Sequence, residues 1–143
     1  MLRLLLTLAV LSSCLVAAQC ADAVPQKELN GVWTLSSGLV AGKNMPKEVL
    51  SSMKLELTDG KYVMTNAEGA DKGDFSVDAK ADPKTMDIEG KEGPNKGKKF
   101  PCIYKLIGDE LTICYDLSGK ARPTEFESKE KTMQFLAVYQ RQK

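Results

Sequence analysis

The sequence predicts an all-β fold, an antiparallel eight-stranded up-and-down β-barrel with one short helix. From Lys54 onward, apolar and polar residues alternate in short runs, which is typical of strands with one buried face. Tight-turn signals such as Asp59-Gly60 and Gly108-Asp109 join these runs, so neighbouring strands should be antiparallel. Closing such a meander removes its exposed edges, and we therefore prefer a barrel to the alternative, a two-sheet sandwich.

The first predicted strand covers residues 31–37 and contains the only tryptophan, Trp33. Trp33 and Leu35 share one face, because side chains alternate along a strand. We expect the indole to close the core rather than to stack on a ligand. After a loop, residues 46–51 predict the one helix, a turn or two that starts with Pro46 and acts as a cap.

Seven further strands are predicted at residues 54–58, 61–65, 73–78, 85–89, 98–106, 111–115 and 133–141. Pro101 restricts the start of its strand to an edge or a bulge, because proline has no backbone N–H to donate. The inward positions hold fifteen large side chains: Trp33, Leu35, Leu55, Leu57, Tyr62, Met64, Phe75, Val77, Met86, Ile88, Phe100, Tyr104, Leu106, Leu111 and Ile113. That number favours a filled interior or a small cavity, and an eight-stranded barrel can have either.

Residues 1–23 are predicted to be a signal peptide, which leaves residues 24–143 as the domain. Arg3 supplies a positive start, residues 4–11 are an apolar run too short to span a bilayer, and Ala21-Asp22-Ala23 fits a signal-peptidase site. Cleavage after Ala18 is nearly as acceptable. The mature chain would then have no transmembrane segment, and we expect it to be secreted or to reside in a bacterial periplasm or cell envelope.

A lipid anchor at Cys14 is a second and less favoured interpretation of the leader, because residues 11–14 also fit a lipobox. Removal of residues 1–23 leaves an even pair of cysteines, Cys102 and Cys114. Lipidation at Cys14 would instead leave Cys20 as a third cysteine in an oxidising compartment. The even number of remaining cysteines therefore favours secretion over lipidation.

Cys102 and Cys114 are a candidate disulfide, because they lie on the two strands that flank Gly108-Asp109. A two-residue turn, however, pairs residue 103 with residue 114 and places Cys102 opposite residue 115, on the other face. A bridge would need a bulge that brings the sulfurs within disulfide geometry. Such a bridge would be a structural staple, since the sequence has no Cys-x-x-Cys spacing.

Composition excludes several classes of function. The 143 residues carry a net charge of +1, which gives no global attraction to nucleic acid. Histidine is absent, and with it the commonest general base and transition-metal ligand. Asp87 and Glu89 alternate with Met86 and Ile88, so they are expected on the solvent side rather than as an acid/base pair. We therefore expect no enzymatic activity, no metal, no cofactor and no nucleic-acid partner.

Two charged loops favour structural roles. Residues 91–99 have the composition of a solvated hairpin loop, and neither an aromatic ladder nor overall positive charge supports anion binding there. Arg122 could bind a carboxylate ligand, but we expect it to fasten its loop to the barrel through Glu125 or Glu127, and Phe126 to be buried beneath that loop.

Longer motifs resemble a known family. Gly31-Val32-Trp33, with Arg141 near the end of the last strand, resembles the Gly-x-Trp signature of lipocalin and calycin barrels, in which the tryptophan closes one end under a late-strand arginine. An uncharacterised lipocalin-like domain family of planctomycete bacteria, usually found behind a signal peptide, is similar at residues 29–33, 45–46, 92–98, 103–104, 108–114 and 122–128. The resemblance implies an exported calycin-type barrel of unassigned activity. A cysteine at position 102 departs from the family pattern.

These features lead us to expect a barrel that binds or sequesters a small hydrophobic or amphiphilic ligand. The candidate binding residues are interior side chains: Leu55, Leu57, Tyr62, Met64, Phe75, Met86 and Tyr104. The alternative is a non-catalytic structural or interaction module of the cell envelope with a filled interior. A cavity open at one end would favour the first function, and a solid core with an exposed apolar patch the second.

Overall fold

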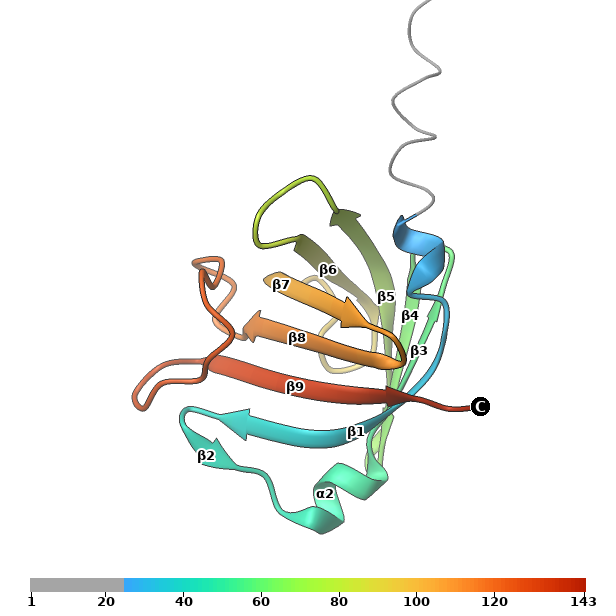
Figure 1. Cartoon of the computed structure of the whole chain (residues 1–143). Helices are drawn as coiled ribbons and strands as arrows, with labels where there is room; N and C mark the ends of the chain where they lie inside the picture. Colours follow the sequence, from blue (N-terminus) through green and yellow to red (C-terminus); the bar gives the residue numbers. More distant parts are fainter. Residues whose placement is uncertain (1–24) are drawn as a thin grey trace, which may run out of the picture.

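The computed structural model describes residues 25–143, so the predicted signal peptide and Cys14 lie outside the described residues. Eight strands form a closed antiparallel barrel, which confirms the predicted fold (Figure 1). Each strand of the ring pairs with the next one along the chain, and β1 pairs with both β3 and β9. The ring consists of β1 (Gly31–Val40), β3 (Lys54–Thr58), β4 (Lys61–Asn66), β5 (Gly69–Asp78), β6 (Thr85–Glu92), β7 (Lys99–Ile107), β8 (Glu110–Asp116) and β9 (Gln134–Arg141).

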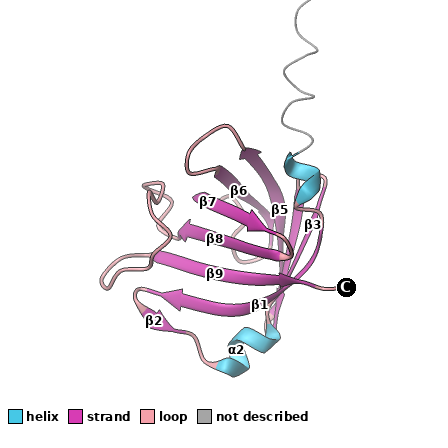
Figure 2. Cartoon of the chain, in the orientation of Figure 1, coloured by secondary structure: helices cyan, strands magenta, loops and turns pink. Residues whose placement is uncertain are grey.

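Short elements outside the ring differ from the prediction (Figure 2). The expected helix is α2 (Lys47–Ser52), which begins after Pro46 rather than at it. Residues 25–28 form a second helical turn where only a polar lead-in was expected. A two-residue strand, β2 (Lys43–Asn44), pairs with the end of β1. The turn of residues 25–28 and the two-residue β2 are too short to show a periodicity from which the sequence could predict them.

Strand β1 closes the barrel because its two halves have different partners. Its first residues, 31–34, pair with β3, and residues 33–40 pair with β9. A bulge between Leu35 and Ser37 shifts the register against β9. Bulges bend a strand and increase its twist, which allows one strand to serve both edges of the meander.

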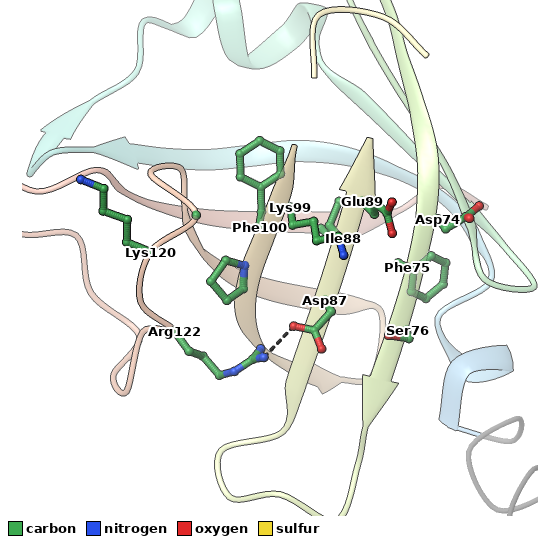
Figure 3. Close-up of a pocket in the computed structure, with 12 residues that line it drawn as sticks. Asp74, Phe75, Ser76, Asp87, Ile88, Glu89, Lys99, Phe100, Lys120 and Arg122 are labelled. Carbon is green, nitrogen blue, oxygen red and sulfur yellow. Dashed lines mark hydrogen bonds and ion pairs between the residues drawn. The ribbon is translucent and has the colours of Figure 1, made fainter. Parts of the chain in front are cut away.

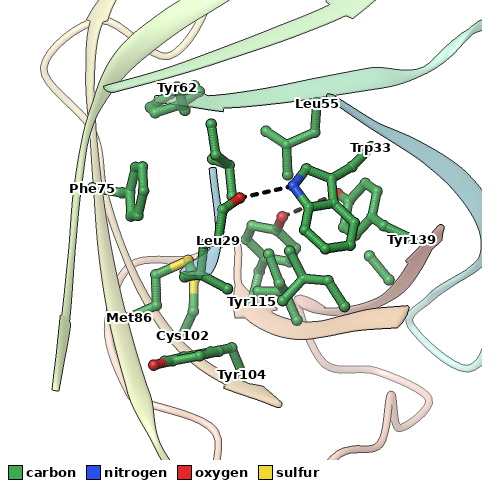
Figure 4. Packing of buried hydrophobic residues seen from close by; sticks show 14 of the residues in the cluster. Leu29, Trp33, Leu55, Tyr62, Phe75, Met86, Cys102, Tyr104, Tyr115 and Tyr139 are labelled. Atoms are coloured by element: carbon green, nitrogen blue, oxygen red, sulfur yellow. Dashed lines mark hydrogen bonds between the residues drawn. The ribbon is translucent and has the colours of Figure 1, made fainter. Parts of the chain in front are cut away.

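The buried side chains inside the barrel are mainly those that the sequence placed there (Figure 4). Of the fifteen inward candidates, twelve are buried in the core cluster, and Met64, Ile88 and Leu106 are partly buried against it. The prediction omitted several interior residues at the N-terminus and on the last two strands: Leu29, Tyr115, Phe135, Ala137 and Tyr139. The hydroxyls of Tyr115 and Tyr139 are 3.0 Å apart, so these two buried polar groups satisfy each other.

Trp33 closes one end of the barrel. Its side chain is fully buried, and its Nε1–H donates a 2.9 Å hydrogen bond to the carbonyl oxygen of Leu29. The guanidinium of Arg141 lies 4.2 Å from the ring centroid, within cation–π range. Arg141 also donates to the carbonyl oxygens of Asn30 and, at 2.9 Å, of Glu28. The arginine therefore ties the segment before β1 to the indole that it covers.

Glycine is required at position 31 for this seal. Gly31 has a φ of +144°, and a Cβ built on it would lie 2.8 Å from the Nη1 atom of Arg141. A side chain there would be strained and would also displace the guanidinium. On its other side, Arg141 forms an ion pair with Asp109, 3.3 Å from Nε to Oδ1, which links the β7–β8 turn to the same end.

Residues 117–133 cover the outer face of β7 and β8, where Ile103 and Cys114 are buried. Arg122 fastens this segment, as expected, but through different partners. It donates to the carbonyl oxygens of Met86 and Cys102 at 3.1 and 2.7 Å, and pairs with Asp87 at 2.6 Å. The predicted partners Glu125 and Glu127 pair with Lys129 instead. Phe126 is half-buried, with the Nζ atom of Lys105 4.8 Å from its ring centroid.

The candidate disulfide between Cys102 and Cys114 is not formed, and both thiols are free and buried. The register is the predicted one, with Cys102 opposite Tyr115 and Ile103 opposite Cys114. Cys102 therefore points into the core, whereas the Cys114 thiol donates to the carbonyl oxygen of Glu127 in the covering segment at 3.3 Å. No bulge interrupts this part of the β7–β8 pairing, so the two sulfurs stay on opposite faces.

The proline prediction for β7 is consistent with the pairing. Pro101 lies opposite Asp87 of β6, but the pairing of β7 with β8 begins only at Cys102. At Pro101, β7 therefore has a single neighbouring strand, which accommodates a residue without a backbone N–H.

Replacing Trp33 by alanine should lower the free energy of unfolding by about 3–5 kcal/mol, because deletion of a buried aromatic ring leaves a cavity. Thermal unfolding followed by circular dichroism should show a Tm lower by roughly 10–20 °C. Ile107→Ala is the control, since Ile107 is an apolar side chain that is 67% exposed and should change the Tm little. Equal melting curves for the wild type and Trp33→Ala would contradict a buried indole.

Both described cysteines should be unreactive in the folded protein. Burial raises the pKa of the Cys102 thiol well above its ordinary value, and burial also raises that of Cys114. Since the thiolate is the nucleophile, alkylation by iodoacetamide at pH 8 should be slow at both residues and fast in guanidinium chloride. Peptide mapping by mass spectrometry measures each cysteine separately, and a Cys102–Cys114 linked peptide in the non-reduced sample would refute the free-thiol arrangement.

Candidate functional site

The barrel has a sealed end and an open end. Because successive strands alternate in direction, the sealed end collects Trp33 and the connections at residues 59–60, 79–84 and 108–109. The open end collects the connections at residues 41–53, 67–68, 93–98 and 117–133. A ligand could therefore enter the interior only from the end opposite Trp33.

A cavity of about 500 Å³ lies inside the barrel and reaches the open end. Six of the seven predicted binding residues line it: Leu55, Leu57, Tyr62, Met64, Phe75 and Met86. The seventh, Tyr104, is buried nearer the sealed end and is not among the lining residues. Further apolar residues on β1, β6, β7, β8 and β9 also line the cavity: Val40, Ile88, Phe100, Ile113, Tyr115 and Phe135.

The segment between β1 and β3 forms an apolar part of the cavity mouth. Its Met45 and Met53 line the cavity, and both are partly buried against the core together with Leu50 of α2. The backbone N–H of Met45 donates a 2.8 Å hydrogen bond to the carbonyl oxygen of Gly38 in β1, which holds the segment against the barrel. The sequence predicted the helix as a cap but did not place these two methionines in the site.

The loop of residues 93–98 forms the polar side of the mouth, with Pro94, Asn95 and Lys98 lining the cavity. Asp71 of β5 holds this loop. Its Oδ1 atom accepts the backbone N–H of Asn95 at 3.0 Å, and its Oδ2 atom accepts the Asn95 side-chain amide at 3.1 Å. The expected solvated loop is therefore folded against the barrel and contributes to the site.

Gly90 allows this close approach. A Cβ built at position 90 would lie 2.0 Å from the carbonyl oxygen of Asn95, a distance that no side chain could tolerate. The backbone N–H groups of Gly90 and Gly97 each donate across the loop, to the carbonyl oxygens of Lys98 and Gly90, both at 2.9 Å. In the sequence, the only indication that this loop packs against the barrel is the glycines that flank its charged residues.

Asp71 also contacts the cavity wall through Tyr62. The Tyr62 hydroxyl donates a 2.8 Å hydrogen bond to Oδ2 of Asp71. Burial, and then this hydrogen bond, raise the pKa of Tyr62 above its ordinary value, so the hydroxyl remains a neutral donor. The interior site thus combines a mostly apolar wall with one carboxylate fixed near its entrance.

A second hollow, of about 610 Å³, lies on the outer face of β5, β6 and β7 (Figure 3). Each of its three carboxylates already has a cationic partner. Asp87 pairs with Arg122 at 2.6 Å, Asp74 with Lys61 at 2.5 Å, and Glu89 with Lys91 at 2.7 Å. This surface is consistent with a solvated, ion-paired face, and the enclosed interior cavity is the stronger candidate for a binding site.

Within residues 25–143, no group of three or more cysteine, aspartate or glutamate side chains is placed to hold a metal ion. In the same part of the chain, no helix has the length and apolar character needed to cross a bilayer.

Comparison with known proteins gave no relative: no protein-family model, no curated protein and no solved structure matches this chain.

Replacing Gly90 by alanine should release the loop of residues 93–98 from the barrel, because the added methyl group collides with backbone. Hydrogen–deuterium exchange should then become faster at the amides of residues 95–98, which the fold protects through the loop hydrogen bonds. Lys91→Ala, one residue away with an exposed side chain, is the control and should leave this exchange unchanged. Unaltered exchange in Gly90→Ala would contradict the proposed packing of the loop.

Proposed function

We propose that this protein is an exported, non-catalytic binding protein that holds one small hydrophobic or amphiphilic ligand inside its barrel. The observation that carries this proposal is the apolar cavity of about 500 Å³ that opens at a single end. Small-molecule sites commonly enclose about 300–1,000 Å³ and combine apolar walls with a few polar groups. The cavity has that size and that composition.

The two ends of the barrel support directional binding. Trp33 and Leu29 are fully buried at the sealed end, so an apolar group entering from the open end would stop above them. Asn66, Glu68, Asp71 and Asn95 place polar groups at the mouth. An amphiphile would thus bury its apolar part and leave its polar part near the entrance.

The alternative, a structural or interaction module with a filled interior, is less well supported. It requires side chains to occupy the barrel completely, whereas Met64 and Ile88 line open space and are only partly buried. The large exposed apolar side chains of the described chain, Val49, Ile107 and Met133, come from α2, the end of β7 and the segment before β9. They offer less support for a contact surface than the cavity offers for a ligand.

The proposal also includes export of the protein and a lack of catalytic activity. The lack of histidine in the sequence and the ion pairing of Asp87 and Glu89 on the outer face support a binding rather than a catalytic role. The signal-peptide pattern of residues 1–23 supports export. Membership of the lipocalin-like family is also proposed, and the position of Trp33 beneath Arg141 supports it.

Met64→Trp should abolish binding of a neutral apolar fluorophore such as N-phenyl-1-naphthylamine, because the larger side chain occupies the cavity near its mouth. Wild-type protein should enhance the fluorescence of the probe in a saturable, one-to-one titration. Val63→Trp is the matched control, because Val63 is the preceding residue on β4 and faces outward. It should bind the probe as the wild type does.

Two results would contradict the proposed function. One is the absence of saturable probe binding to folded wild-type protein, and the other is equal binding by Met64→Trp and the wild type. Native mass spectrometry of protein purified from its own organism provides an independent measurement, since a bound ligand appears as an added mass that denaturation removes.

A further inference from the structure

We propose that the ligand carries a cationic ammonium head group and that Asp71 binds it at the mouth of the cavity. This inference rests on the proposed binding function and specifies the chemical class of the ligand. It is carried by one carboxylate that the barrel holds at the boundary between the apolar wall and the entrance.

The strand register places Asp71 on the inner face of the barrel. Asp71 of β5 pairs with Met64 of β4, and both residues line the cavity. Gly73, the next inward position on β5, pairs with Tyr62 and has no side chain, so the Tyr62 ring packs close to it. The Tyr62 hydroxyl then reaches Asp71 from within the barrel. The carboxylate is therefore part of the cavity wall and not of the outer surface.

The carboxylate is held by three donors, and all three are neutral. They are the Tyr62 hydroxyl at 2.8 Å, the Asn95 backbone N–H at 3.0 Å and the Asn95 side-chain amide at 3.1 Å. A carboxylate offers about four acceptor sites, so room for one further donor remains. The three hydrogen bonds fix the orientation of the group without cancelling its charge.

Three carboxylates on the outer face of β5 and β6 have a different environment. Asp74, Asp87 and Glu89, on the outer faces of β5 and β6, each lie within 2.7 Å of a lysine or arginine nitrogen. Among the described residues, no lysine or arginine nitrogen lies within 4.0 Å of Asp71. The inward-facing carboxylate is thus left for a cation that the described part of the chain does not supply.

The charges at the mouth favour a cation over an anion. Among the lining residues, Glu68 adds a second negative charge, and Lys98 is the one basic residue, with an exposed side chain. An ammonium group next to Asp71 would form a charge-assisted hydrogen bond in partly desolvated surroundings. A carboxylate head group in the same place would be repelled, and an uncharged head group could donate a hydrogen bond but would not compensate the charge of Asp71.

Three compounds with one tail test the charge preference on the full chain: decylamine, decanol and decanoate, each titrated against bound N-phenyl-1-naphthylamine below its aggregation limit. At pH 7, decylamine should displace the probe at a concentration about tenfold or more below that of decanoate, with decanol between them. Asp71→Asn keeps the shape of the side chain and removes its charge. It should weaken decylamine binding about tenfold and leave decanol within about twofold.

Glu92→Gln is the matched control. Glu92 ends β6 at the same end of the barrel, but its side chain is exposed, does not line the cavity and approaches Lys72 only at 4.0 Å. This variant should retain the wild-type preference for decylamine. If Glu92→Gln keeps the preference for decylamine and Asp71→Asn loses it, the preference comes from the charge of Asp71. A general attraction to the negative charges around the open end of the barrel would be weakened in both variants.

Asp71 also holds the loop of residues 93–98, and head-group selectivity separates that structural role from the proposed one. A purely structural role would weaken the binding of all three compounds together, whereas the proposal requires decylamine to bind more weakly, decanol to change little and decanoate to bind no more weakly than to the wild type. If wild-type protein binds decanoate as tightly as decylamine, or more tightly, the ammonium inference is wrong, although the proposed binding function remains. This comparison uses the wild type alone and therefore does not depend on whether Asp71→Asn folds. Failure of the probe and of all three compounds to bind the wild type would overturn both.

Discussion

The double pairing of β1 is the constraint on which the rest of the structure depends. Residues 31–34 pair with β3 and residues 33–40 with β9, and the bulge after Leu35 lets one strand serve both neighbours. Without it, the meander would be an open sheet with two unpaired edges and no enclosed space. Closure also makes the two ends unequal, since Trp33 and Arg141 seal the end where β1 begins and β9 stops.

Strand periodicity was enough to predict the barrel, because a strand with one buried face must alternate apolar and polar residues. The hairpin of β3 and β4 and the β7–β8 register followed from two-residue turns. The same register places Cys102 and Cys114 on opposite faces, and the bulge that the candidate disulfide required is not present in this pairing. The inward face of β9 was not assigned, because that strand is apolar on both sides: Leu136 and Val138 alternate with the interior residues. When both faces of a strand are apolar, the sequence pattern does not indicate which face points into the barrel.

The candidate site was predicted only where strands build it. Six interior residues came from alternation, but Asp71 precedes the predicted start of β5 at residue 73, and Asn95 belongs to a loop that composition marks as solvated. Asp71 and Asn95 are 24 residues apart in the sequence, and their contact depends on the absence of a side chain at Gly90. Local propensity cannot predict such a contact, because it arises from the closed barrel and not from either segment alone.

Asp71 is a partly buried carboxylate at the mouth of an apolar cavity, and its neighbours in the fold supply neutral donors only. A carboxylate that loses water at the mouth of an apolar cavity is stabilised by the donors on Tyr62 and Asn95, yet it remains an unpaired charge within the described chain. An apolar residue at this position would suit the neighbouring Met64 and would avoid the desolvation of a charge. The contacts with Asn95 and Tyr62 use both oxygens of Asp71 as acceptors and leave about one acceptor position of the carboxylate free. This free acceptor position and the lack of a cationic partner within the described chain support the proposal that a cation binds there.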